Sequence, residues 1–79
     1  MKIKKNIALS DSGFVFDPAT GNSFTTNPIG LEIINLLKQE KTPEEIEKEI
    51  TSAYAIDAEI FERDLSDFVN VLTKMRLTE

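Results

Sequence analysis

Residues 14–27 constrain the fold most, because their sequence FVFDPATGNSFTTN predicts two short strands joined by a tight turn. Phenylalanine and valine at 14–16 favour a pleated, half-buried surface. Residues 23–26 resume a strand, and Asn27 followed by Pro28 ends it. Because the sequence after this hairpin has helical periodicity, the hairpin supplies most of the β-surface that the chain can offer.

The loop of the hairpin combines residues that favour a turn for different reasons. The side chain of Asp17 can accept a hydrogen bond from the backbone two residues on. Pro18 has the φ angle that the second position of a type I turn requires. Gly21 can adopt the left-handed conformation that such a loop needs before the next strand.

The register of the two strands stays open at this level. A four-residue loop over 18–21 would place Val15 opposite Phe24 and Phe14 opposite Thr25. A shift by one residue would turn every side chain to the other face of the sheet. The register therefore decides which side chains reach the core, and local patterns leave it undetermined.

Length and composition allow one small domain. A chain of 79 residues, of which 41% are apolar, has enough hydrophobic side chains for one core. A domain of this size buries about 60–65% of the surface that its unfolded chain exposes. Its unfolding free energy should be about 4–12 kcal/mol. We therefore expect a single domain over residues 1–79, with little room for a deep substrate cavity.

Several functional classes are disfavoured by what the sequence lacks. It contains no cysteine and no histidine, so the commonest metal ligands and the commonest general base are missing. A catalytic site built from carboxylates, lysine and hydroxyls stays open as an alternative. The net charge of −5 disfavours nucleic acid as a partner, because phosphate binding needs clustered basic residues. The basic cluster present is Lys2, Lys4 and Lys5.

Targeting and membrane signals are also missing from the sequence. No apolar run approaches the roughly 20 residues that cross a membrane. The N-terminal lysines are not followed by the apolar stretch of a secretory signal. We therefore expect a cytoplasmic protein without a membrane partner.

Residues 2–9 alternate between apolar and polar side chains, which predicts a half-buried strand. One face carries Ile3, Ile7 and Leu9, and the other carries Lys2, Lys4 and Asn6. Lys5 interrupts the apolar face, which indicates an edge strand or a frayed strand. With a turn at 10–13, this strand and the hairpin form a three-stranded antiparallel meander.

Three helices are predicted after the hairpin, and each has a recognisable start. Asn27 caps the first, and the proline after it fits the first helical position. Thr42 caps the second, where Glu45 completes a capping box. Asp57 caps the third, which runs to about residue 75. The apolar stripes are Ile29, Ile33, Leu36 and Leu37 with Leu31 and Ile34 in the first, Ile46, Ile50, Ala53 and Tyr54 in the second, and Phe61, Leu65, Phe68, Leu72 and Met75 in the third.

Three strands followed by three helices with short connections predict an α+β fold with a winged-helix-like arrangement. Winged helices commonly bind DNA, so a DNA-binding regulator is one alternative function. That function needs basic side chains on a helix that enters the major groove. The second helix instead carries Glu44, Glu45, Glu47 and Glu49 against Lys48, and this charge would be repelled by phosphate.

The order of these segments resembles the PqqD family, the small peptide-binding domains also called RiPP recognition elements. Residues 14–18 with Thr20 and Gly21 match the strand and turn of the family, and Phe24, Asn27 and Pro28 match its next strand and helix cap. Residues 42–46 (TPEEI) match its helix start, residues 54–57 (YAID) match its connector, and Asp64, Phe68 and Leu72 match its final helix. The resemblance covers nearly the whole chain.

Two positions depart from the family pattern. The family often has a glycine before the second helix, where this chain has Glu40 and Lys41. It also often has a glycine before the last apolar residue, where this chain has Met75 and Arg76 before Leu77. Both departures lie at helix ends, so they bear on loop conformation more than on function.

The resemblance implies that the chain binds the leader of a ribosomally made precursor peptide and presents it to a modifying enzyme, without catalysis or a cofactor of its own. The leader would add as an extra strand beside the third strand, in a groove walled by the third helix. The implied strand residues are Ser23, Phe24, Thr25 and Thr26, and the implied helix residues are Phe61, Asp64, Leu65 and Phe68. By family analogy, the enzyme would be a radical SAM protein or an ATP-grasp ligase.

The same residues also have simpler explanations. Most of the apolar helix residues are expected in the core, and Phe61 and Phe68 are the better candidates for also facing a groove. Asp64 and Asp67 either form a solvated flank or select a leader with lysine or arginine by electrostatic steering. A free strand edge can pair with its own copy, so a homodimer through residues 23–26 is a further expectation. A small interaction module for an unrelated protein is the remaining alternative function.

Overall fold

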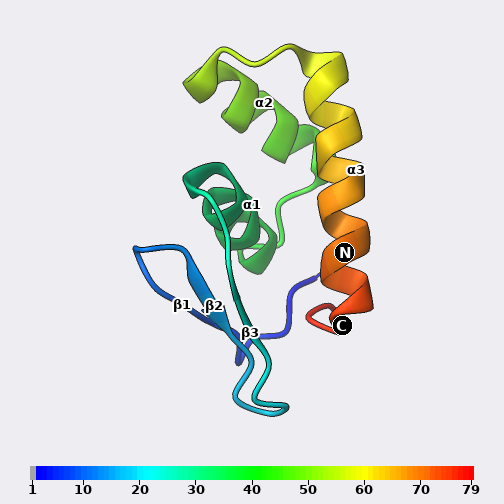
Figure 1. The fold of residues 1–79 in the computed structure, drawn as a ribbon. Helices are drawn as coiled ribbons and strands as arrows, with labels where there is room; N and C mark the ends of the chain where they lie inside the picture. The colour runs from blue at the N-terminus through cyan, green and yellow to red at the C-terminus, as the bar shows by residue number, and fades with distance from the viewer. Residues whose placement is uncertain (1) are drawn as a thin grey trace.

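Three short strands precede three helices in the computed structural model, which describes residues 2–79 (Figure 1). The elements are β1 Ala8–Leu9, β2 Phe14–Phe16, β3 Ser23–Thr25, α1 Pro28–Lys38, α2 Pro43–Tyr54 and α3 Ala58–Lys74. The sheet lies at one end of the molecule, and α3 runs along the length of one side (Figure 1). The predicted α+β, winged-helix-like order is therefore confirmed. Met1, the first residue of the expected domain, lies outside the described residues.

The hairpin has the register that a four-residue loop requires. Val15 pairs with Phe24 and Phe14 pairs with Thr25, so residues 18–21 form the loop. Within it, the Asp17 carboxylate accepts a hydrogen bond from the Ala19 N–H at 3.0 Å. The register turns Val15 into the core and leaves Phe14 exposed.

The predicted strand over residues 2–9 is wrong in its extent. Strand β1 contains only Ala8–Leu9, and the chain turns at residues 5–6. Lys5 would lie on the buried face of a continuous strand, where its charge has no partner. Instead, residues before the turn pair with the C-terminus: the Lys4 N–H donates to the Leu77 carbonyl at 2.9 Å, and the Glu79 N–H donates to the Lys2 carbonyl at 2.9 Å.

The three predicted helix caps are confirmed. The Asn27 side chain accepts from the Gly30 N–H at 2.7 Å. Thr42 and Glu45 form the reciprocal capping box, with distances of 2.9 and 3.1 Å. This bonding to Thr42 lowers the pKa of the Glu45 carboxyl. Each cap satisfies backbone N–H groups that have no partner inside the helix, which explains why the boundaries follow the sequence so closely.

One core joins the sheet, the helices and both chain ends. Its buried side chains are Ile3, Ile7, Val15, Ile33, Ile34, Leu36, Leu37, Ile46, Ile50, Phe61, Leu65, Leu72 and Leu77. The stripe predicted for α2 is only half correct, because Ala53 and Tyr54 are exposed. The Tyr54 hydroxyl instead donates to the Glu32 carboxylate at 2.7 Å, which holds the ring on the surface.

A residue with left-handed backbone conformation lies at each of the two positions where the chain departs from the family pattern. Glu40 has φ 61° and Arg76 has φ 59°. At the end of α3, the Leu77 N–H donates to the Leu72 carbonyl at 3.1 Å and the Arg76 N–H donates to the Thr73 carbonyl at 3.0 Å. This is a Schellman motif, in which glycine usually takes the left-handed position. A side chain there carries a steric cost.

We expect Arg76→Gly to raise the unfolding free energy by about 0.5–1 kcal/mol. Glycine removes the left-handed penalty of about 1–2 kcal/mol, and the greater freedom of the unfolded chain offsets part of the gain. Urea unfolding measures the change. Arg76→Ala is the matched control, since it removes the same charge but keeps the Cβ, and it should not stabilise. Equal stabilisation by both variants would show that the charge, and not the backbone, matters.

Candidate functional site

Strand β3 is the outer strand of the sheet, because the strand order is β1-β2-β3. In antiparallel pairs, hydrogen-bonded and non-hydrogen-bonded positions alternate. The Thr26 N–H donates to the Gly13 carbonyl at 2.8 Å and the Asp17 N–H donates to the Asn22 carbonyl at 2.8 Å. Between these two bonds the pairing alternates, so the backbone N–H and C=O groups of Ser23 and Thr25 point away from β2. They form a free row of donors and acceptors.

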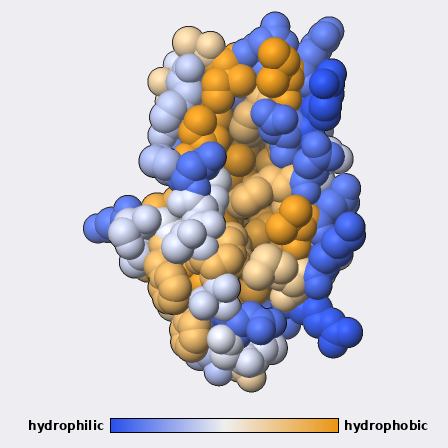
Figure 2. All heavy atoms as spheres, viewed as in Figure 1, coloured by the Kyte–Doolittle hydropathy of each residue, from blue (hydrophilic) through white to orange (hydrophobic). Residues whose placement is uncertain are grey.

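A groove of about 420 Å³ begins where this edge ends, at Thr26 and Asn27. Its residues come from the end of β3, from α1, from the α2–α3 connection and from α3; they are Thr26, Asn27, Ile29, Gly30, Ile33, Ile56, Phe61, Asp64, Asp67, Phe68 and Val71. Figure 2 shows apolar side chains gathered in the hollow between α3 and the β3–α1 side, with hydrophilic side chains along the outer edge of α3. We call this the leader-side groove, after the leader that the resemblance to the PqqD family implies here.

Most of the residues implied by the resemblance lie along the edge or in this groove. Thr26, Phe61, Asp64 and Phe68 line it. Phe61 is buried in its floor and Phe68 is half-buried. On the strand, Ser23 and Thr25 are exposed, whereas Phe24 is half-buried and packs against the core.

Leu65 is the exception among these residues. It is buried and lines a different pocket, between α2 and α3. Leu65 lies only about 40° around the helix from Phe61, but this rotation is toward α2, whose residues Pro43, Glu44 and Glu47 line the same pocket. The structure therefore does not bring Leu65 together with the groove residues.

Sequence reasoning missed the contribution of α1 to the groove. Ile29, Gly30 and Ile33 form its second wall. Their spacing places them on one helix face, but spacing alone does not say what that face contacts. A Cβ on Gly30 would collide with the hydroxyl of Thr26, so glycine lets α1 begin directly against the end of β3.

The groove combines an apolar floor with an acidic rim. Asp64 and Asp67 are exposed at this rim. Neither is in an ion pair within residues 2–79, where the recorded pair joins Lys2 and Glu40. An extended segment lying here would meet backbone groups on one side, apolar side chains below and negative charge at the margin.

The described part of the chain offers no arrangement for metal chemistry. Among residues 2–79, no three acidic side chains come together as candidate metal ligands. No helix within this range is both long and apolar enough to cross a bilayer.

Comparisons with known proteins agree with this geometry. The family model described as Coenzyme PQQ synthesis protein D (PqqD) matches residues 13–77. A solved structure described as TbiB1 in complex with the TbiA(beta) leader peptide is similar, with a TM-score of 0.87 and 35% sequence identity. That similarity covers 100% of this chain and 95% of the other. No curated protein sequence matches the chain.

Proposed function

The chain belongs to the PqqD family, and from this premise we propose that it binds the leader of a ribosomally synthesised precursor peptide and presents it to a peptide-modifying enzyme. The observation that carries the proposal is the free edge of β3 beside the leader-side groove. The similar TbiB1 structure contains a leader peptide, which supports the same class of ligand here.

Binding would occur by strand addition. The leader would pair with the outward backbone groups of Ser23 and Thr25 and extend the sheet by one strand. Alternate leader side chains would then point into the groove against Phe68 and Ile29. Backbone pairing supplies affinity with little sequence demand, and the apolar groove selects which leaders fit.

The domain itself would carry out no chemistry in this scheme. Its role would be to hold the leader so that the rest of the precursor reaches the active site of the enzyme. By analogy with the family, that enzyme would be a radical SAM protein or an ATP-grasp ligase. Because ribosomes supply the precursor, this recognition step would take place in the cytoplasm.

An amide NMR titration tests the proposal. The labelled protein is titrated with the leader of a candidate precursor encoded beside its gene, and with the TbiA(beta) leader as a second peptide. We expect the largest shifts at Ser23, Thr25 and Thr26 and at the α3 residues that line the groove, which are Phe61, Asp64, Asp67, Phe68 and Val71. If these amides stay unchanged at saturating peptide, the leader binds elsewhere or not at all, and the proposed site is wrong.

The same free edge could join two copies of the chain. A homodimer through β3 would occupy Ser23 and Thr25 and would compete with the leader. Sedimentation at increasing protein concentration, with and without leader, separates the two cases. A dimer that the leader dissociates would show that both use this edge.

Charge reversal at the rim should weaken leader binding in a salt-dependent way. We expect Asp64→Lys and Asp67→Lys each to lower the affinity for a basic leader by about 2- to 10-fold in low salt, because exposed charges steer and select by long-range attraction. The effect should shrink as salt rises, since screening removes it. Isothermal titration at two salt concentrations measures this.

Glu49→Lys is the matched control for these reversals, because Glu49 is exposed on α2 and lines no part of the groove. It changes the net charge equally, and we expect it to leave leader affinity nearly unchanged. Affinity that is indifferent to both rim reversals would show that Asp64 and Asp67 are only a solvated flank.

A further inference from the structure

A second pocket, of about 310 Å³, lies between α2 and α3. Its apolar lining comes from Pro43, Leu65 and Val69. At 100° per residue, the α3 residues of this pocket fall on nearly the opposite face of the helix from those of the leader-side groove. We call it the α2–α3 pocket. A partner could occupy it while the leader occupies the groove.

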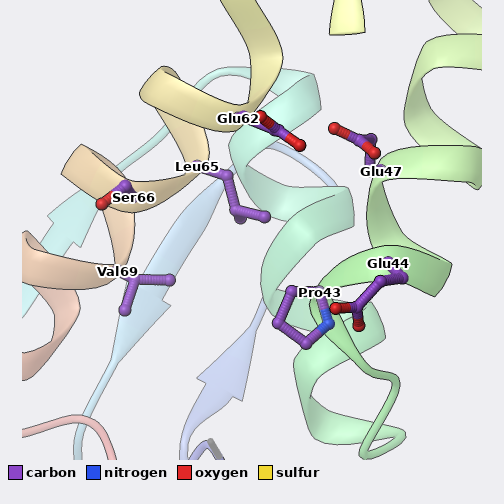
Figure 3. A pocket seen from close by; sticks show the side chains of 7 residues that line it. All are labelled: Pro43, Glu44, Glu47, Glu62, Leu65, Ser66 and Val69. Carbon is purple, nitrogen blue, oxygen red and sulfur yellow. The ribbon is translucent and has the colours of Figure 1, made fainter. Parts of the chain in front are cut away.

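Three carboxylates border the α2–α3 pocket: Glu44 and Glu47 from α2, and Glu62 from α3. Glu47 and Glu62 point toward each other across it (Figure 3). The Glu47 Oε1 atom is buried and accepts no hydrogen bond within residues 2–79. None of the three is in an ion pair in the same range.

This arrangement is unfavourable for the isolated protein. Burial raises the pKa of the Glu47 carboxyl above its ordinary value of 4.5, and the negative charge of Glu62 raises it further. A buried carboxylate oxygen normally has a donor. Within residues 2–79, the group that faces Glu47 is the Glu62 carboxyl, and a hydrogen bond between the two carboxyls also raises the pKa of Glu47. The pair therefore lacks a basic partner in this part of the chain. Lys48, the basic residue of α2, does not supply it, because it lies with Glu45, Glu49 and Ser52 on another side of the helix.

We propose that the α2–α3 pocket docks the modifying enzyme through a basic side chain, arginine above all, inserted between Glu47 and Glu62. A guanidinium can donate to two carboxylates at once, which fits facing acids on two helices. Apolar neighbours of that arginine would cover Pro43, Leu65 and Val69. This inference rests on the proposed function, because it names where the enzyme meets the leader-binding domain.

Charge favours an enzyme over a second copy of this chain as the occupant. The chain has a net charge of −5, so a copy brought to this acidic pocket would be repelled. A basic surface on another protein would be attracted to it. Placing the enzyme on one face of α3 and the leader on another lets a single domain hold both at once.

The test measures binding of the purified modifying enzyme encoded with this chain and its precursor peptide. The variants are Glu47→Gln, Glu62→Gln and the double variant, with Glu49→Gln as the matched control on the exposed face of α2. We expect the double variant to lose at least about tenfold in enzyme affinity, because the inserted cation loses both partners. Glu49→Gln should change enzyme affinity less than twofold, and leader affinity should be unchanged in all four.

The melting temperature of Glu47→Gln distinguishes a docking role of the Glu47–Glu62 pair from a purely structural role. Because the pKa of Glu47 is raised in the folded state, ionising it costs stability; that cost is absent below pH 4.5 and grows as the pH rises through the raised pKa. Glu47→Gln should therefore raise the melting temperature at pH 7 and leave it unchanged at low pH, while it weakens enzyme binding. A lower melting temperature at pH 7 would overturn the inference and make the pair structural.

Two further outcomes separate this inference from the proposed function. If the leader binds normally and the double variant keeps its full enzyme affinity, only the docking site is wrong. The same conclusion follows if Glu49→Gln weakens enzyme binding as much as the double variant does. If the leader does not bind even to the wild-type protein, the proposed function fails and this inference falls with it.

Discussion

Replacing Thr25 by proline is expected to weaken leader binding by about 10- to 100-fold while leaving the domain folded. The N–H of Thr25 lies on the free edge of β3, where the leader would pair. Proline removes this donor and places its ring in the path of the incoming strand. Loss of one hydrogen bond and the steric conflict together should cost about 1.4–2.8 kcal/mol of binding free energy.

The fold should survive the Thr25→Pro substitution. Thr25 faces Phe14 in a pair that does not exchange backbone hydrogen bonds, and outer strands tolerate proline where the N–H faces solvent. Thr25→Ala is the matched control: it removes the side chain but keeps the N–H, and it should bind the leader within about twofold. Isothermal titration gives the affinities, and the NMR spectrum checks the fold. Tight binding by a folded Thr25→Pro variant would mean that the leader does not pair with this edge.

Replacing Gly13 by alanine should cause the largest loss of stability among the variants considered, about 2–4 kcal/mol. Gly13 has φ 92°, a conformation that costs any residue with a Cβ about 1–3 kcal/mol. In addition, a Cβ at this position would overlap the carbonyl oxygen of Thr26. The Thr26 N–H donates to the Gly13 carbonyl at 2.8 Å, so the strand pair would have to separate where the groove begins.

Gly21→Ala separates the two contributions. Gly21 has a similar φ of 81°, but no atom lies within 4 Å of the position a Cβ would take. It should therefore show only the conformational cost, about 1–2 kcal/mol. Urea unfolding of both variants gives the difference. Against an expected stability of about 4–12 kcal/mol, Gly13→Ala would unfold a measurable part of the protein at 37 °C if the wild-type value lies near the lower end of that range. Equal losses of unfolding free energy in the two variants would show that the contact with Thr26 adds no cost beyond that of the backbone conformation.

Gly13 and Gly30 both lie at the junction between β2, β3 and α1. Gly13 allows the end of β3 to approach β2, and Gly30 allows α1 to begin against Thr26. These close approaches bring the free edge of β3 and the α1 wall of the groove together. The binding surface therefore depends on two glycines that would never contact a leader through side chains.

Local features of this protein could be predicted from sequence because the interactions that create them span only a few residues. The caps at Asn27, Thr42 and Asp57 each act on N–H groups two or three positions away. The hairpin loop is held by Asp17 and by a positive φ at Gly21 in the same way. The existence and order of the elements, and the outer position of β3, followed from these signals.

Contacts between distant segments were decided only by the tertiary structure. Residues 2–4 pair with the C-terminus and do not extend β1. The alternation of Ile3 and Ile7 indicates that their side chains are buried, but it does not indicate which segment lies beside them. The same holds on α3, where Phe61 and Leu65 share one apolar stripe yet face the leader-side groove and the α2–α3 pocket respectively. Helical spacing identifies which side chains leave water, and only the tertiary packing around α3 determines which surface each one forms.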